Sequence, residues 1–271
     1  MKFAICNETF QGWDWEKTCK YAAQTGYDGI EIAPFTLAED VRQIDAERRR
    51  SIRETALAEG LEVVGLHWLL VSPKDLSMTS PDAATRTTTS DYVVSLVDFC
   101  GDVGGKVMVF GSPGQRRIAE GDTPEIAEER FIEAIRPALD RAAERNITIC
   151  LEPLPSPEAN YLLTLAEAVS LMNRLNHPAA KTIFDVKSAS SESAPLHQLA
   201  REYAPYYAHV HANDANRRGP GFGETDFKPV LATLKETGYE GYVSVEVFDY
   251  SPDPETIATQ SLRYLRESLN A

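Results

Sequence analysis

Short apolar runs typical of β-strands alternate with helix patterns along the whole chain, and the alternation recurs eight times. Alternating strands and helices are typical of a parallel sheet, because each helix carries the chain back to the start of the next strand. Eight repeats within 271 residues give a unit of about 34 residues, which suits a (β/α)8 barrel. We therefore expect an α/β fold with one TIM-barrel domain over residues 1–271, since no break in composition divides the chain.

The boundaries of the expected elements follow from the apolar pattern and from capping residues such as Asp14, Asp82 and Thr123. The expected strands are 2–6, 28–33, 61–69, 106–111, 147–152, 181–186, 206–211 and 241–247. The expected helices are 14–25, 38–59, 82–103, 123–145, 164–175, 194–203, 226–237 and 253–268.

The chain is acidic, with a formal net charge of −14, and its acidic residues are spread along the expected helices. A protein that binds a phosphate backbone gathers Lys and Arg residues instead, so we expect no nucleic-acid partner. No apolar run reaches the roughly 20 residues of a membrane span, and the N-terminal segment turns polar too early for a signal peptide. The four cysteines have no paired spacing, so we expect buried thiols. Together with the absence of a long apolar run, this leads us to expect no membrane partner and a cytoplasmic location.

Four residues with metal-binding side chains stand where expected strands end: Glu152, Asp185, His211 and Glu246. They are 33, 26 and 35 residues apart, each interval being close to one strand–helix unit. The carboxyl ends of barrel strands meet at one open face, so residues distant in sequence line a single pocket there. The sequence therefore predicts that these four side chains lie together.

The alternation of side chains along the expected strands turns further ionisable residues inward. Successive side chains point to opposite faces, so His209 and His211 share one face of their strand. The same rule places Glu31 and His67 toward the barrel interior. Buried charge is costly unless it is paired or bound to a metal, so this composition indicates a functional site.

Three carboxylates crowded into one pocket repel one another, and a divalent cation relieves that repulsion. Carboxylate ligands with a single imidazole favour Mn²⁺, with Mg²⁺, Co²⁺ and Zn²⁺ as alternatives. The alternative without a metal is that each acid pairs separately with an Arg or Lys residue. Four such residues at matching strand ends favour the shared site.

Several segments resemble one family of barrels along essentially the whole chain. They are GLHWLL, CLEPLPSPE, FDV, HVHANDANRRGPGFGETDF and VSVEVFD. The sequence resembles the xylose isomerase-like barrels of sugar isomerases and epimerases, and among them the D-tagatose/D-psicose 3-epimerases. Hydroxypyruvate isomerase and inosose dehydratase are relatives in that family.

The resemblance implies a role for each strand-end residue. Glu152, Asp185, His211 and Glu246 match the positions that hold the metal in the family, and the two glutamates match its acid/base pair. Glu158 and Arg217 match residues that bind the sugar. Ser188 stands where the family has a histidine that contacts the substrate near its carbonyl group, so the chain departs from the family there.

Three further residues are candidates for substrate contact. His67 ends its strand facing inward, and the alternative is a core histidine bonded to a neighbour. Trp13 opens the first helix and could wall the sugar pocket or pack against its neighbours. Asp214 follows His211 and is a candidate for hydrogen bonds to the substrate or within the loop. The glycine-rich segment 219–223 is expected to be a flexible loop over the site.

The predicted residues can transfer a proton next to a carbonyl group. A metal on the carbonyl oxygen and the adjacent hydroxyl acidifies the C–H bond between them and stabilises the enediolate that forms. One glutamate removes the proton, and the other returns a proton to give an epimer or an isomer. We expect a metal-dependent sugar isomerase, of the ketose 3-epimerase type. A keto-inositol or keto-sugar dehydratase, in which a β-hydroxyl is lost, is the alternative.

Two other classes of protein, a nuclease and a non-catalytic subunit, fit the sequence less well. Endonuclease IV resembles this barrel, but its three-metal site needs more histidines, one of them at the position of Ser188, and a charge of −14 opposes DNA binding. A non-catalytic sugar-binding subunit would not need the complete metal set. The expected partner is a small sugar or sugar-like molecule, and the resemblance implies a homo-oligomer, either a dimer or a tetramer.

Overall fold

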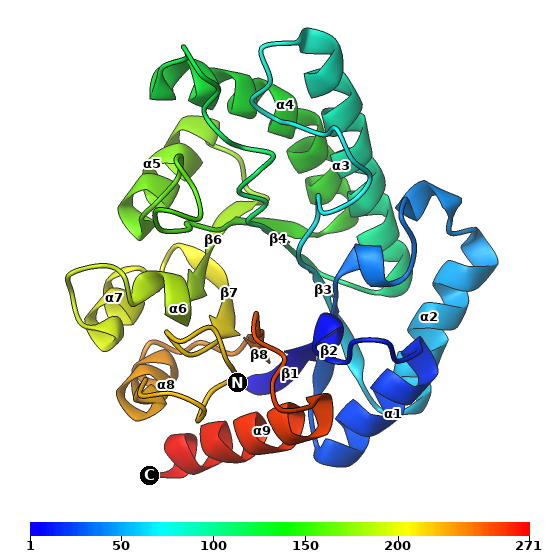
Figure 1. Ribbon diagram of the computed structural model, residues 1–271, viewed down its shortest axis with the longest axis vertical. Helices are drawn as coiled ribbons and strands as arrows, with labels where there is room; N and C mark the ends of the chain where they lie inside the picture. The colour runs from blue at the N-terminus through cyan, green and yellow to red at the C-terminus, as the bar shows by residue number, and fades with distance from the viewer. The chain divides into compact units, whose positions relative to one another are not determined.

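A computed structural model describes all 271 residues, and its eight parallel strands form a closed barrel in chain order. The strands are β1 (Lys2–Cys6), β2 (Gly29–Ile32), β3 (Glu62–Leu66), β4 (Val107–Phe110), β5 (Thr148–Leu151), β6 (Ala180–Asp185), β7 (Tyr207–Ala212) and β8 (Tyr242–Val245). Figure 1 shows these strands with the helices that connect them. The predicted TIM barrel is therefore confirmed.

The helices lie where the sequence places them, with two local differences. They are α1 (Trp15–Thr25), α2 (Ala46–Ala58), α3 (Ala83–Val103), α4 (Pro124–Arg145), α5 (Leu165–Leu175), α6 (Val186–Ala189), α7 (Leu196–Glu202), α8 (Phe227–Glu236) and α9 (Pro254–Asn270), with 3-10 turns η1 (Asn7–Thr9), η2 (Pro34–Thr36) and η3 (Val41–Gln43). None of these helices is both long enough and apolar enough to span a membrane.

The expected helix 38–59 was wrong at its start. Asp40 accepts the N–H of Arg42 and ends up capping only the short turn η3. Asp45 then accepts the N–H of Arg48 at 2.8 Å, so the regular helix α2 begins after this second cap. Two side chains that compete for backbone donors therefore divide the segment.

The helical turn α6 was not predicted. It follows β6 directly, and Asp185 caps it by accepting the N–H of Ser188 at 2.6 Å. The carboxylate at the end of β6 thus has its geometry set by the backbone that follows it.

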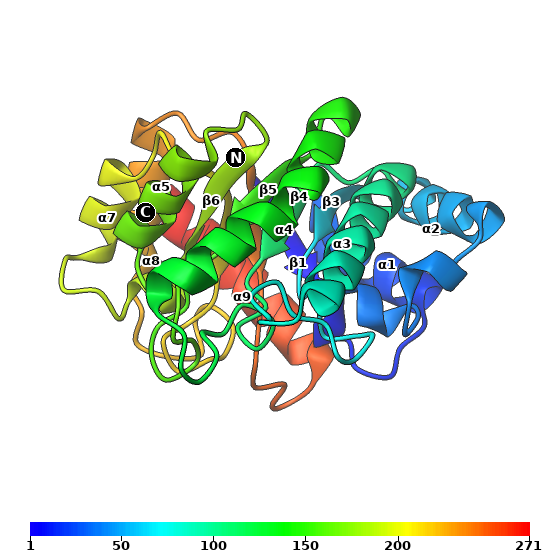
Figure 2. The same ribbon diagram turned by 90° about the horizontal axis from the view of Figure 1, so that it is seen from above.

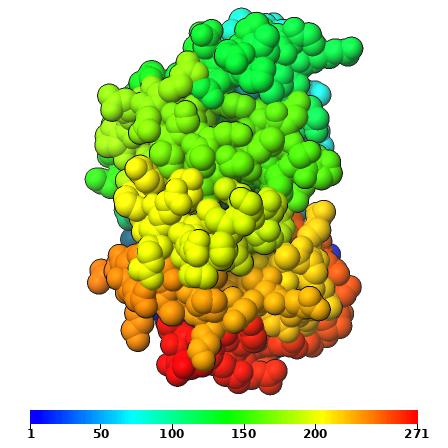
Figure 3. Space-filling model, turned by 90° about the vertical axis from the view of Figure 1, so that its left-hand side faces the viewer, coloured from blue at the N-terminus to red at the C-terminus, as the bar shows by residue number.

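The chain divides into two compact units, the first made of residues 1–32, 51–64 and 183–271. In this unit β1 pairs in parallel with β2 and β8, and β8 pairs with β7. Helix α9 packs against α1 and α8, and α7 packs against α8. Figure 3 shows the surfaces of the C-terminal segments in chain order, from yellow to red.

The second unit consists of residues 33–50 and 65–182. Its strands β3, β4 and β5 pair in parallel, and β5 pairs with the start of β6. Helices α3 and α4 run side by side, as Figure 2 shows. Arg145 of α4 donates to Asp102 of α3 at 2.7 Å, so a charged hydrogen bond joins the two helices.

Side chains on the strands separate into apolar and polar sets, as their alternation predicts. Val243 and Val245 of β8 are buried, and so is the intervening Ser244, whose Oγ lies 3.6 Å from the Sγ of Cys6 on β1. All four cysteines are buried and none forms a disulfide, which confirms the expected buried thiols.

Gly65 provides a test of how closely β3 and β4 approach. A Cβ atom added at Gly65 would lie 1.8 Å from the carbonyl oxygen of Val107, with which Gly65 is in register. We predict that Gly65→Ala lowers the free energy of unfolding by about 3 kcal/mol, because the backbone of a paired strand must shift. Gly114→Ala is the control, since nothing lies within 4 Å of an added Cβ there. Equal denaturation midpoints for the two variants would contradict the prediction.

Candidate metal centre

Three of the predicted ligands lie together in the first unit, at the ends of its strands. Asp185 is the last residue of β6, His211 lies near the end of β7, and Glu246 follows β8. His211 Nδ1 lies 3.2 Å from Glu246 Oε2 and 4.0 Å from Asp185 Oδ2. All three side chains are buried. Their ligand atoms are within 4.8 Å of one another, so they could share one metal ion.

Asn213 joins two of these carboxylates. Its Nδ2 donates to Asp185 Oδ2 at 2.6 Å and to Glu246 Oε2 at 3.1 Å, and its Oδ1 accepts the backbone N–H of Lys187 at 2.9 Å. The side chain is completely buried. The amide therefore holds the two acids at a fixed separation and offsets part of their repulsion.

The crowding of charge changes the protonation of the cluster. Burial raises the pKa of Asp185, and the nearby Glu246 raises it further, whereas Lys187 and His211 lower it. Burial lowers the pKa of His211, but Glu246 and Glu31 more than reverse this and raise it well above its usual value. Without a cation the site therefore tends to hold protons that a metal would displace.

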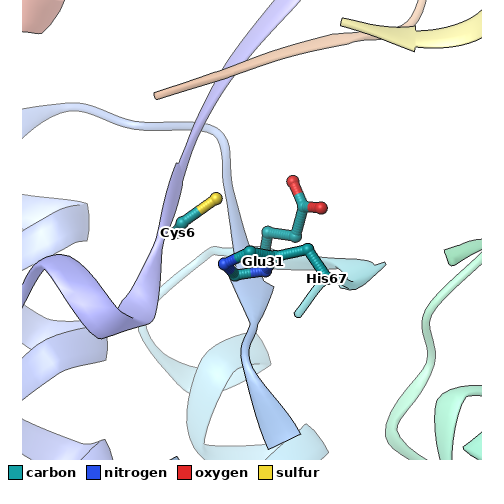
Figure 4. Close-up of side chains that lie close together, drawn as sticks. All are labelled: Cys6, Glu31 and His67. Atoms are coloured by element: carbon teal, nitrogen blue, oxygen red, sulfur yellow. The ribbon is translucent and has the colours of Figure 1, made fainter. Parts of the chain in front are cut away.

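The other nitrogen of His211 faces a second carboxylate. His211 Nε2 lies 3.1 Å from Glu31 Oε1, and His209 Nε2 lies 2.9 Å from Glu31 Oε2. Glu31 on β2 is in register with Cys6 on β1, and Figure 4 shows both side chains on these neighbouring strands. Burial raises the pKa of Glu31, but His209 and His211 outweigh it and hold that pKa well below its usual value. Glu31 is thus a buried carboxylate.

Glu152, the fourth predicted ligand, belongs to the second unit, where it follows β5 and is buried. Its carboxylate packs on the backbone of Gly111, since a Cβ added there would lie 2.0 Å from Glu152 Oε2. Arg116 is completely buried in the same unit, and burial lowers its pKa to about 10 while the charge of Glu152 opposes that shift. The missing side chain of Gly111 leaves room for the carboxylate of Glu152, and the positive charge of Arg116 stabilises it.

Ser188, an expected substrate contact, lies three residues after the predicted ligand Asp185. Its side chain is buried, its N–H donates to Asp185, and its Oγ has no hydrogen-bond partner. A hydroxyl group thus occupies the position for which the family resemblance implies a histidine.

Asp214 and Arg217 shape the loop after β7. The carboxylate of Asp214 accepts Thr225 Oγ1 at 2.9 Å, so its side chain organises the loop. Arg217 is exposed, has a φ of 72°, and lies over the ring of Phe248 at 5.4 Å. The segment 219–223 expected to be flexible is tied to α9, because Gln260 donates to the carbonyl of Gly221 at 2.9 Å.

The remaining candidates for substrate contact are Trp13, His67 and Glu158. Trp13 packs with Phe10 and Tyr21, at centroid distances of 5.2 and 5.5 Å. His67 is completely buried after β3, and Glu158 is half-buried in a turn closed by its own N–H. Their contacts with a substrate stay predictions.

The sequence pattern assigns no specific role to Asn213 or His209, although it already places His209 on the same face of its strand as His211. Each lies two residues from His211, and side chains two apart on a strand share a face. The next inward-facing position after His211 is Asn213, so the same alternation identifies it as a neighbour of the site.

Comparison with known proteins places the chain in a family. A family model described as xylose isomerase-like TIM barrel matches residues 19–268, so the chain belongs to this family. The 3-dehydro-D-guloside 4-epimerase of Escherichia coli (strain K12) is 25% identical over 281 aligned residues, with 98% of this chain and 99% of that protein covered. The D-psicose 3-epimerase of Ruminiclostridium cellulolyticum is 26% identical, with 87% of this chain and 80% of that protein covered.

The solved structures agree on the fold. The crystal structure of D-psicose 3-epimerase with D-tagatose from Clostridium cellulolyticum H10 superimposes with a TM-score of 0.86 and 20% identity, covering 99% of each chain. The named relatives are epimerases, which are isomerases, so the predicted family and enzyme class are confirmed.

The amide of Asn213 can be tested by an isosteric change. We predict that Asn213→Asp lowers the free energy of unfolding of the metal-free protein by about 2–4 kcal/mol, because it replaces two donated hydrogen bonds by repulsion between carboxylates. Asn216→Asp is the control, since Asn216 is exposed in the same loop. Urea denaturation in the presence of a chelator measures both, and equal losses would contradict the bridging role.

The raised pKa values of Asp185 and His211 predict how metal binding depends on pH. Both groups hold protons that a metal must displace, so metal affinity should increase as the pH rises. Competition with a coloured chelator at about pH 6 and about pH 8 measures the change. Calorimetry in two buffers with different ionisation enthalpies should show proton release, and an affinity independent of pH would contradict the prediction.

Proposed function

We propose that the protein is a divalent-metal-dependent sugar isomerase of the ketose 3-epimerase type. The observation that carries this proposal is the buried cluster of Asp185, His211 and Glu246 at consecutive strand ends. The family membership and the epimerase names of the relatives support the reaction class.

Glu152 is the proposed fourth ligand. It follows β5, whose Leu151 is in register with Thr182 of β6, the strand that ends in Asp185. In a closed parallel barrel the carboxyl ends of adjacent strands lie on the same face. Three carboxylates supply hard oxygen donors and one imidazole supplies a nitrogen donor, a set that supports Mn²⁺ with Mg²⁺, Co²⁺ and Zn²⁺ as alternatives.

The two glutamates are the proposed acid/base pair. The metal, when bound, supplies a positive charge that acidifies a C–H bond next to a carbonyl group. Glu152 follows β5 and Glu246 follows β8, and each glutamate is proposed to act on one face of the sugar. One removes the proton and the other returns a proton, which inverts the carbon.

The substrate is proposed to contact Glu158, Arg217, His67, Ser188, Asp214 and Trp13. The 4-epimerase relative is named for a 3-dehydro sugar, and inversion next to its carbonyl needs the same proton transfer. Keto sugars therefore belong beside free ketoses among the candidate substrates. Four buried cysteines without a disulfide support a reducing compartment, the cytoplasm. On the basis of the family resemblance, the protein is also proposed to form a homo-oligomer, either a dimer or a tetramer.

Ser188 favours a second candidate, a keto-inositol or keto-sugar dehydratase. A hydroxyl group at this position offers a different contact near the carbonyl than the histidine implied by the epimerase resemblance. The same proton abstraction followed by loss of a β-hydroxyl would give dehydration. An epimer that carries solvent deuterium supports epimerisation, whereas a product lighter by one water supports dehydration.

We predict that Glu152→Gln and Glu246→Gln each abolish exchange of solvent deuterium into the substrate, since an amide cannot accept the proton. Ketoses, keto-inositols and 3-keto sugars are incubated in deuterated water with Mn²⁺ and analysed by mass spectrometry. Glu240→Gln is the matched control, because this exposed residue precedes β8 whereas Glu246 follows it. Full exchange in both site variants would overturn the proposed pair.

A further inference from the structure

Glu31 is a buried carboxylate that meets two imidazoles. Its Oε1 lies 3.1 Å from His211 Nε2, and its Oε2 lies 2.9 Å from His209 Nε2. The side chains of all three residues are at most 1% exposed. A carboxylate oxygen accepts hydrogen bonds, and an imidazole nitrogen facing each oxygen is the donor, so both Nε2 atoms carry the donated hydrogens.

This arrangement fixes which nitrogen of His211 faces Asp185 and Glu246. With hydrogen on Nε2, the lone pair available for a metal is on Nδ1, and Nδ1 lies 3.2 Å from Glu246 Oε2. The rotation of the ring is set at the same time, because its two nitrogens are held between Glu31 and Glu246. A carboxylate behind a ligating histidine commonly has this orienting effect.

We propose that Glu31 is the positioning residue of the metal centre, and that His209 in turn positions Glu31. Glu31 keeps His211 in the tautomer that presents Nδ1 to the cation. The inference rests on the proposed function, because it requires Asp185, His211 and Glu246 to hold a divalent ion.

His209 completes the arrangement. Its Nε2 contacts Oε2 of Glu31, the oxygen that His211 does not contact. Its ring stands edge-on to that of His211, with 5.1 Å between centroids and 80° between planes. Without His209, one oxygen of a buried carboxylate would lose a donor, which is costly in the barrel interior. His209 therefore holds the carboxylate of Glu31 in its orientation toward His211.

The backbone holds these residues rigidly. Glu31 lies within β2 in register with Cys6 of β1, while His209 and His211 are both within β7. Sites built on strands keep their geometry better than sites built on loops. The positioning residues thus belong to the barrel wall.

The first experiment measures metal affinity in Glu31→Gln. We expect Mn²⁺ to bind about 10–100-fold more weakly, because the amide donates at one side and no longer selects the Nε2–H tautomer of His211. Glu62→Gln is the matched control, since Glu62 is an exposed strand residue paired with Lys2, and its affinity should equal the wild-type value. The melting temperature of each metal-free variant is recorded separately, so that a loss of folding is not mistaken for a loss of affinity.

Affinity in Glu31→Gln within twofold of wild type overturns the proposal, whatever its melting temperature. His209→Asn should weaken Mn²⁺ binding by an intermediate amount, because Glu31 keeps its bond to His211. Two Mn²⁺ ions per chain, one of them lost in His209→Asn, would mean that Glu31, His209 and His211 bind an ion themselves, and this also overturns the proposal.

The second experiment needs no variant. ¹⁵N NMR of the wild-type protein with labelled histidine, loaded with diamagnetic Mg²⁺, should show His209 and His211 both protonated on Nε2. His211 without hydrogen on Nε2 overturns the proposal even if Glu31→Gln fails to fold. Absence of any metal binding by the wild-type protein overturns the proposed function and the inference together. Normal binding with the wrong tautomer overturns the inference alone.

Discussion

The repulsion between buried carboxylates at the ends of neighbouring strands governs this site. Asp185 and Glu246 lie beside one imidazole in a region closed to water, where like charges cost most. Asn213 donates to both acids, and the N–H of Ser188 donates to Asp185. Each compensating donor follows a strand end, so the fold and the charge arrangement depend on each other.

The barrel limits this repulsion by placing Asp185 and Glu246 at the ends of separate strands, β6 and β8. The register of parallel strands fixes the height of each residue, and the turn that follows supplies donors for it. Helical turn α6 is an example, since it begins at Asp185 and directs an N–H at the carboxylate. A loop alone could hold such residues only at a larger entropic cost.

The sequence predicted the barrel because an eightfold alternation of strands and helices has few other solutions. It also placed Asp185, His211 and Glu246 together, since strand ends converge in that fold. It did not predict the bridge made by Asn213 or the start of α2, because these depend on which of several polar groups captures a given backbone or side-chain partner. Such competition is decided by distances of a few tenths of an ångström, which no residue pattern contains.

The loop after β7 is joined to a helix far along the chain. Gln260 donates to the carbonyl of Gly221, and Tyr264 donates to that of Thr225 at 3.0 Å. Arg217 belongs to the same loop, and its carbonyl oxygen accepts the N–H groups of Phe248 and Asp249, which follow β8. Through the contact with the sugar that is proposed for Arg217, substitutions at Gln260 or Tyr264 of α9 would alter which sugars are accepted, while every proposed metal ligand stays the same.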